Sequence, residues 1–149
     1  MENDVVVEIR SDSDLVTARA EARALAARLG FSRTDATLIA TAISEIARNI
    51  VVHVGRGQIA MRLVQEDRRH GLVAVATDEG PGIRDLDAAL AGGNASRGGL
   101  GLGLPGARRL MDEFEVSCGP ERGTRVTMTK WRVLDELELL RKRRRDQGR

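Results

Sequence analysis

The chain has 149 residues, 42% of them hydrophobic, which suits a single domain with a core of its own. Only 2% of the residues are aromatic and none is tyrosine, which argues against the stacking surfaces that bind RNA or single-stranded DNA. The net charge of +2 comes from the end of the chain: residues 141–149 hold six of the 24 basic and one of the 22 acidic residues, so the remaining body, with 18 and 21, is mildly acidic.

The first third of the chain predicts a strand followed by two helices. Residues 5–9 form an apolar run that is typical of a strand. Capping residues at 11–14 precede an Ala-, Leu- and Arg-rich segment that predicts a helix to about Leu29. Ser32 can cap a second helix, whose apolar residues keep helical spacing to about His53 before Gly55 ends it.

The middle of the chain predicts two strands of different character. Residues 58–64 alternate between polar and apolar, which indicates a strand with one polar side. After a charged turn at 66–71, residues 72–77 are apolar on both faces, as in an inner strand. We expect a short helix at 85–90 and a mobile, glycine-rich loop at 91–99 to follow.

The last third predicts a helix at 104–112, paired strands at 115–117 and 124–131, and a terminal helix at 134–145. Strands and helices do not alternate strictly, which argues against a doubly wound parallel sheet. We therefore expect an α+β fold, a two-layer α/β sandwich with helices on one face of a mixed, mostly antiparallel sheet. Residues 1–133 would form this domain and residues 134–149 a basic tail, helical or disordered.

The sequence also predicts a compartment. Cys118 is the only cysteine, so no disulfide can form within the chain. No apolar run approaches the roughly 18 residues that span a bilayer, and the acidic N-terminus lacks a signal-peptide pattern. We expect a cytoplasmic protein with no membrane partner.

The second predicted helix carries a polar row beside its apolar face. Thr41, Glu45, Asn49 and His53 recur every four residues, which places them on one side of a helix. An ordinary solvated stripe would look the same. An amide oxygen such as that of Asn49 is, however, a suitable ligand for a hard cation, and a carboxylate one turn away can act as a base.

Two glycine-rich segments accompany this row. Asp78 ends an apolar strand and is followed by Gly80 and Gly82; a simple turn explains the glycines, but an acid at that position needs a partner. Residues 98–104 alternate glycine and leucine ahead of a predicted helix, where free N–H groups favour a phosphate. The run comes too late in the chain for a Rossmann motif, and no P-loop sequence is present.

Together the three segments resemble those of the GHKL ATPases, the superfamily of histidine-kinase ATPase domains, which implies ATP and Mg²⁺ as ligands. The resemblance implies that Asn49 ligates Mg²⁺ on the ATP phosphates and that Glu45 orients or deprotonates the attacking group. It also implies that Asp78 accepts a hydrogen bond from the adenine amino group. The other nucleotide-binding residues that it implies are Gly80, Gly82, Arg97, Gly99, Gly101, Gly103 and Thr124, with 91–97 as a lid.

Within this superfamily the short chain is similar to the anti-sigma-factor serine kinases, and closest in pattern to the stressosome switch kinases of the RsbT type. Residues 43–50, 55–59, 98–106 and 109–114 carry that similarity. It implies an ATP-dependent serine/threonine protein kinase that acts on a small STAS-domain protein of the RsbS or RsbR type. It also implies contact with a PP2C-type phosphatase like RsbU.

Two alternatives remain open from the sequence. The protein would be a binding module if it held ATP only as a structural ligand and sequestered a sigma factor or another regulator. The Arg-rich tail could bind nucleic acid. We favour the alternative that it is a solvated helix end.

Overall fold

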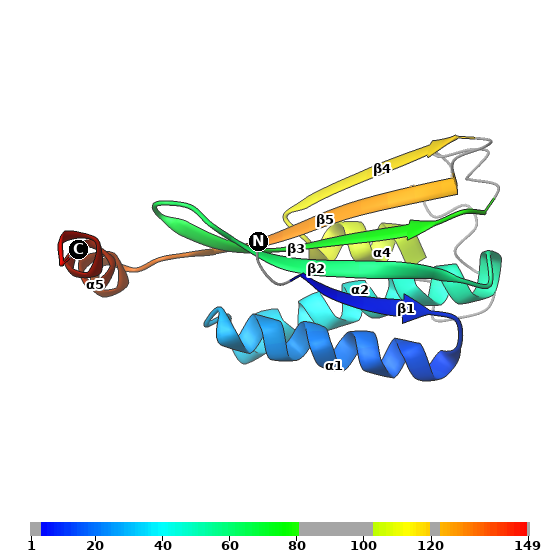
Figure 1. Cartoon of the computed structure of the whole chain (residues 1–149), viewed down its shortest axis with the longest axis horizontal. Helices are drawn as coiled ribbons and strands as arrows, with labels where there is room; N and C mark the ends of the chain where they lie inside the picture. Colours follow the sequence, from blue (N-terminus) through cyan, green and yellow to red (C-terminus); the bar gives the residue numbers. More distant parts are fainter. Residues whose placement is uncertain (1–3, 81–102, 120–122, 149) are drawn as a thin grey trace.

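The structure is built in two layers, a five-stranded sheet and a layer of helices on one of its faces (Figure 1). This computed structural model describes residues 4–80, 103–119 and 123–148. The strands are β1 (Val5–Ile9), β2 (Gly57–Gln65), β3 (Arg69–Asp78), β4 (Glu113–Gly119) and β5 (Gly123–Val133). They lie in the order β1-β2-β3-β5-β4, and each described pairing is antiparallel. The predicted α+β sandwich is confirmed.

The helical layer consists of α1 (Asp12–Arg28), α2 (Arg33–His53) and α4 (Gly103–Leu110), and a further helix, α5 (Glu136–Gln147), lies beyond the end of the sheet (Figure 1). Both long helices have side-chain caps, because Asp14 accepts a hydrogen bond from the N–H of Ser11 at 3.1 Å and Ser32 accepts one from Asp35 at 3.0 Å. No helix within the described ranges is both long and apolar enough to cross a bilayer.

The core between the layers is mainly aliphatic, as the scarcity of aromatic residues requires, and Phe31 is its one buried aromatic side chain among the described residues. Strands and helices contribute to it through alternating and helical spacing respectively. Its largest fully buried side chains are Ile9, Ile39, Ile43, Ile59, Met61, Leu72 and Met128. Because Ile39 and Ile43 lie on α2 and the β2 and β3 side chains face them, the core fixes α2 against the middle of the sheet.

The hairpin of β2 and β3 is longer than predicted. Residues 66–71 were expected to form a charged turn, but β3 begins at Arg69, so only a short turn remains. The N–H of Glu66 closes this turn by donating a hydrogen bond to the carbonyl of Arg69 at 2.9 Å. The sequence pattern stops at Leu72 because Arg69 and His70 are charged or polar. Both residues pair in register with β5, which a local pattern does not show.

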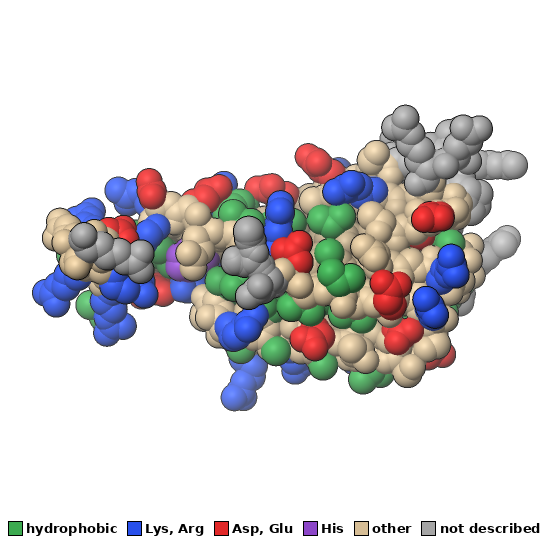
Figure 2. Space-filling view, in the orientation of Figure 1, with side chains coloured by type: hydrophobic (Ala, Val, Ile, Leu, Met, Phe, Trp, Pro, Cys, Tyr) green, Lys and Arg blue, Asp and Glu red, His purple; other side chains and the backbone are tan. Residues whose placement is uncertain are grey.

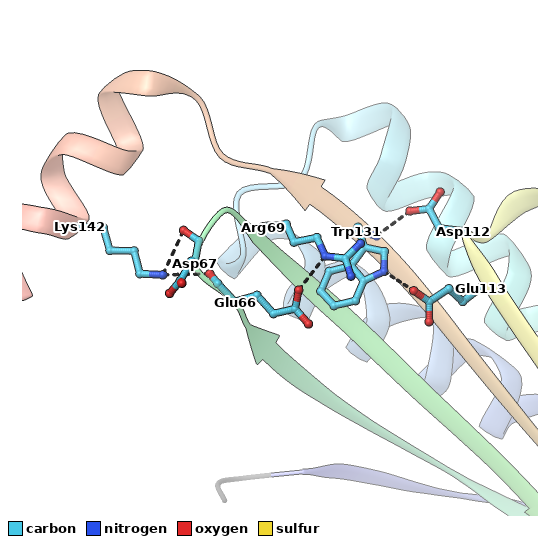
Figure 3. A network of polar contacts seen from close by, with 7 residues as sticks. All are labelled: Glu66, Asp67, Arg69, Asp112, Glu113, Trp131 and Lys142. Carbon is cyan, nitrogen blue, oxygen red and sulfur yellow. Dashed lines mark hydrogen bonds and ion pairs between the residues drawn. The ribbon is translucent and has the colours of Figure 1, made fainter.

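Trp131 is the partner of Arg69 (Figure 3). The guanidinium carbon of Arg69 lies 3.6 Å from the centroid of the indole, a cation–π contact. The indole N–H donates to Glu113 at 2.7 Å, and the ring covers Gly71, where a Cβ would come within 2.8 Å of it. Gly71 thus makes room for the ring, and the stack joins β3, β4 and β5 on the sheet face opposite the helices.

His70 points to the helix side of the sheet, opposite Arg132 in register. The sequence predicted that this residue lies in a charged turn, but it belongs to β3 and its side chain is half-buried. Burial lowers the pKa of its imidazole, and the nearby Arg132 and Lys142 lower it further. These surroundings favour the neutral form of the ring.

Helix α5 is tied to the hairpin tip by polar contacts. Arg132 donates two hydrogen bonds to the Glu138 carboxylate, at 2.9 and 2.7 Å, and a third to the carbonyl of Leu29 at 2.8 Å. The Arg132 guanidinium lowers the pKa of the Glu138 carboxyl to about 2. Lys142 donates to the carbonyls of Glu66 and Asp67, at 2.9 and 3.3 Å (Figure 3). A helix was expected at 134–145, and the observed one begins after the capping residue Asp135.

Candidate functional site

Asp78 is the last residue of β3 and lies between Gly57 of β2 and Thr124 of β5. Its Oδ1 atom accepts hydrogen bonds from the N–H of Gly80 at 2.9 Å and from the N–H of Thr124 at 3.3 Å. The carboxylate is half-buried. Both bonds use Oδ1, so they hold the carboxylate in place and do not occupy Oδ2, which can accept from another donor. The acid that the sequence singled out therefore has a fixed orientation.

Glycines crowd around Asp78 where side chains would not fit. A Cβ on Gly123 would lie 2.0 Å from the carbonyl oxygen of Asp78, and one on Gly57 would lie 2.5 Å from that of Thr77. A Cβ on Gly80 would meet the side chain of Val54 at 2.8 Å. The backbones of β2 and β5 thus approach the end of β3 closely at Gly57 and Gly123, where only glycine fits.

Replacing Gly123 with Ala tests this close approach. Gly123 has φ +71°, so the change adds backbone strain to the contact with Asp78. Gly55 is a matched control, because its φ is +103° but nothing lies within 4 Å of an added Cβ. In urea unfolding, Gly55→Ala should cost only the strain, about 1–2 kcal/mol, and Gly123→Ala about 3 kcal/mol or more. Equal losses would contradict the packing around Asp78.

A cavity of about 820 Å³ opens beside Asp78, at the edge of the sheet where β1 and β3 end and β2 begins. Its volume is within the range of small-molecule sites. Residues from β1, α2, β2 and β3 line it, among them Arg10, His53, Arg56, Asp78 and Gly80. The lining contains two arginines as well as the carboxylate of Asp78, so it can offer both cations and an acceptor to a ligand.

The polar row on α2 leads away from this cavity. His53 lines it, and Asn49 and Glu45 lie one and two turns earlier on the same side of the helix. Both side chains are half-buried, and neither belongs to the lining of the cavity. His53 is exposed at the helix end. The structure therefore places Asp78 and the end of α2 together, and the predicted metal ligand Asn49 deeper along the helix.

Helix α4 packs against α2 and carries the last glycine of the predicted phosphate segment. Gly103 is its first residue, and at its other end Lys130 donates to the carbonyl of Leu110 at 3.1 Å. The helix observed at Gly103–Leu110 is two residues shorter at its end than the predicted one. N–H groups at the N-terminal end of a helix lack partners within the helix, and such an end favours an anion.

Several predicted features lie outside the described residues. They are Gly82, Arg97, Gly99 and Gly101, the short helix expected at 85–90 and the loop expected at 91–99. Of the other predicted nucleotide-binding residues, Thr124 lies beside Asp78 and donates its N–H to the carboxylate. Gly80 donates its own N–H to the same oxygen.

Sequence reasoning missed three residues of the site. Gly57 flanks Asp78, and Arg10 and Arg56 line the cavity. The two glycines that bracket Arg56 were a usable signal, since glycine at the start of a strand often marks a close backbone approach. Arg10 gave no signal, because its position follows only from the pairing of β1 with β2.

The donor set fits a magnesium nucleotide. The carboxylate of Asp78 is a suitable acceptor for an exocyclic amino group, and the cavity beside it has room for a ligand. The amide oxygen of Asn49 suits a hard cation. The chemistry of these residues therefore fits ATP with Mg²⁺.

Comparison with known proteins shows the family of this chain. The family model "Histidine kinase-like ATPase domain" matches residues 10–130. The serine/threonine-protein kinase RsbT of Bacillus subtilis is 43% identical over 131 residues, which cover 88% of this chain and 98% of the relative. The anti-sigma F factor of Caldanaerobacter subterraneus is 30% identical over 76% of this chain and 82% of its own length. That of Oceanobacillus iheyensis is 32% identical over 64% and 69%.

Proposed function

We propose that this chain, which belongs to the family of histidine kinase-like ATPase domains, transfers phosphate from Mg-ATP to a serine or threonine of a small STAS-domain protein. The assignment as a serine/threonine protein kinase rests on the similarity to RsbT over nearly the whole of that relative. The STAS-domain substrate, its place in stress-response partner switching and the cytoplasm as its compartment are the finer parts of the proposal.

The observation that carries the proposal is the setting of Asp78. Its Oδ1 is held by two backbone N–H groups, and the bonds leave Oδ2 able to accept from the amino group of adenine. The cavity of about 820 Å³ beside it leaves room for a ligand next to this carboxylate. A structural carboxylate would not need an open cavity beside it.

The remaining residues divide the work of phosphoryl transfer. ATP with Mg²⁺ supplies the phosphoryl group and neutralises its charge when bound, and catalysis then depends mainly on positioning. Asn49 would hold the cation by its amide oxygen, and the start of α4 would face the phosphates with its N–H groups. Glu45, one turn from Asn49, would orient or deprotonate the acceptor hydroxyl.

The partners follow from the same proposal. The substrate would be an RsbS- or RsbR-like STAS-domain protein, recognised through its folded surface. A PP2C-type phosphatase like RsbU would be a second, regulatory partner. Partner switching between the two would couple phosphorylation to the release of this chain.

A sequestering module is the second candidate. The similarity to anti-sigma F factors favours it, since an anti-sigma factor by name acts on a sigma factor. In that case ATP would be bound for structure, and the partner would be held without transfer of phosphate.

One experiment separates the two candidates. The wild-type protein is incubated with labelled ATP, Mg²⁺ and the STAS-domain proteins encoded alongside it. The kinase should label a serine or threonine of one of them, and chelation of Mg²⁺ should abolish the label. Tight binding of a partner without any labelling would favour the sequestering module instead.

A further inference from the structure

Helix α5 is an element that the ATPase fold does not require. The family match ends at residue 130, and α5 begins at Glu136. Figure 1 shows α5 beyond the hairpin of β2 and β3, at the opposite end of the sheet from the Asp78 end of β3. None of its residues is buried. Its contacts with the domain leave most of its surface for another purpose.

One side of α5 holds it to the domain. Glu138 is bound by Arg132 and Lys142 by the carbonyls of Glu66 and Asp67, and these residues are four apart on the helix. Leu139, between them, is half-buried. Because residues four apart share one side of a helix, this attachment fixes which side of α5 faces away.

The opposite side is both apolar and basic. Leu137 and Leu140 expose 56% and 53% of their surface. Arg141 and Arg144 are exposed and fall on the same side, at positions i+4 and i+7 from Leu137. Two large apolar side chains held in water beside two guanidinium groups indicate an uncovered contact surface, because the attached side of the helix already offers burial to Leu139.

The positive charge also extends around the helix. Arg143 and Arg145 are exposed as well, so four exposed arginines follow one another around α5 within five residues. Figure 2 shows basic side chains projecting around this end of the molecule. An acidic groove on a protein would neutralise only the arginines on one side of such a helix. A layer of anionic groups that surrounds the helix would neutralise all four arginines.

Nucleic acid and an anionic lipid surface both provide such a layer, and the leucines distinguish them. Phosphates of DNA or RNA are bound by arginines alone, and the exposed Leu137 and Leu140 would gain nothing. At a lipid surface the same leucines reach the acyl boundary while the arginines stay among the headgroups. We expected no membrane partner from the sequence because no apolar run in it is long enough to span a bilayer, but an interfacial helix does not need to span it.

We propose that α5 is a docking helix for an anionic lipid surface, with Leu137 and Leu140 inserted at the headgroup boundary and Arg141 and Arg144 on the lipid phosphates. The hairpin end of the domain would then lie next to the lipid surface, and the Asp78 end would face away from it. The proposal does not depend on the kinase activity, since α5 takes no part in the nucleotide site.

The test is sedimentation of the full-length protein with vesicles. Vesicles of phosphatidylcholine alone are compared with vesicles of equal parts phosphatidylcholine and phosphatidylglycerol. The wild type should bind the anionic vesicles, and high salt should release it. Leu137→Ala with Leu140→Ala, and separately Arg141→Gln with Arg144→Gln, should each weaken binding at least about tenfold. Both pairs keep good helix formers, and circular dichroism checks that α5 remains folded.

Matched changes on α1 serve as the control. Arg19→Gln with Arg23→Gln removes the same charge from exposed positions and should leave vesicle binding within about twofold, since these residues lie outside α5. Equal binding to neutral vesicles, or no effect of the leucine pair, would overturn the proposal. So would tighter binding to a short DNA duplex, measured by fluorescence anisotropy, that the arginine pair abolishes and the leucine pair leaves unchanged.

Discussion

Replacement of Asp78 by Asn is expected to weaken the binding of Mg-ATP at least tenfold, or about 1.4 kcal/mol. An asparagine has one acceptor oxygen where the aspartate has two. If that oxygen stays with the N–H groups of Gly80 and Thr124, the new NH₂ group faces the amino group of adenine, donor against donor. If the side chain turns round, the two backbone donors lose their acceptor instead.

Isothermal titration calorimetry with Mg-ATP measures this loss. Asn49→Ala should weaken binding to a similar extent, because it removes the proposed oxygen ligand of the cation. The control is Glu79→Gln, which removes a neighbouring, exposed carboxylate of the same cavity and should change affinity by less than about twofold. Unchanged affinity for Mg-ATP in both site variants would show that Asp78 and Asn49 do not form the nucleotide site.

Replacement of Glu45 by Ala is expected to slow phosphate transfer by a factor of about 10² or more, the usual range for a positioned base. Glu45 lies on α2 one turn from Asn49 and two turns from the cavity, so the change should spare the adenine contacts of Asp78. ATP affinity and partner binding should therefore stay within about twofold of the wild type while the rate of transfer falls.

Two assays on the same variant test this expectation, a pull-down with the STAS-domain partner and transfer from labelled ATP. Glu21→Ala is the control, since it removes an exposed carboxylate from α1 without approaching α2's polar row. Transfer by Glu45→Ala at the wild-type rate would place Glu45 in a solvated stripe. A parallel loss of ATP affinity would instead show that its role is in binding.

The elements that the sequence predicted well are those with local signals at both ends. The end of α2 was predicted because Gly55, with φ +103°, adopts a conformation that other residues rarely take. The start of β3 was wrong because Arg69 is stabilised by Trp131, which is distant in the sequence. Where a strand depends on its neighbour across the sheet, its own residues do not reveal its length.

The same distinction holds for the candidate site. Asp78 could be singled out from the sequence because an acid at the end of an apolar strand is costly to bury without a partner. The glycines packed around it could not, since Gly57 and Gly123 reach Asp78 only through the pairing of β3 with β2 and β5. The exposed face of α5 could not be predicted from the sequence for a different reason. The contacts of Glu138 and Lys142 with the domain decide which leucines of the helix stay exposed.

The position of Trp131 gives the protein an intrinsic optical probe. It is the only tryptophan, and no tyrosine is present to transfer excitation to it. Its indole, stacked under Arg69 and bonded to Glu113, belongs to the hairpin end near α5 and not to the Asp78 end of the sheet (Figure 3). Its fluorescence therefore observes the end of the molecule that carries α5, so events there can be followed in the unlabelled protein separately from nucleotide binding.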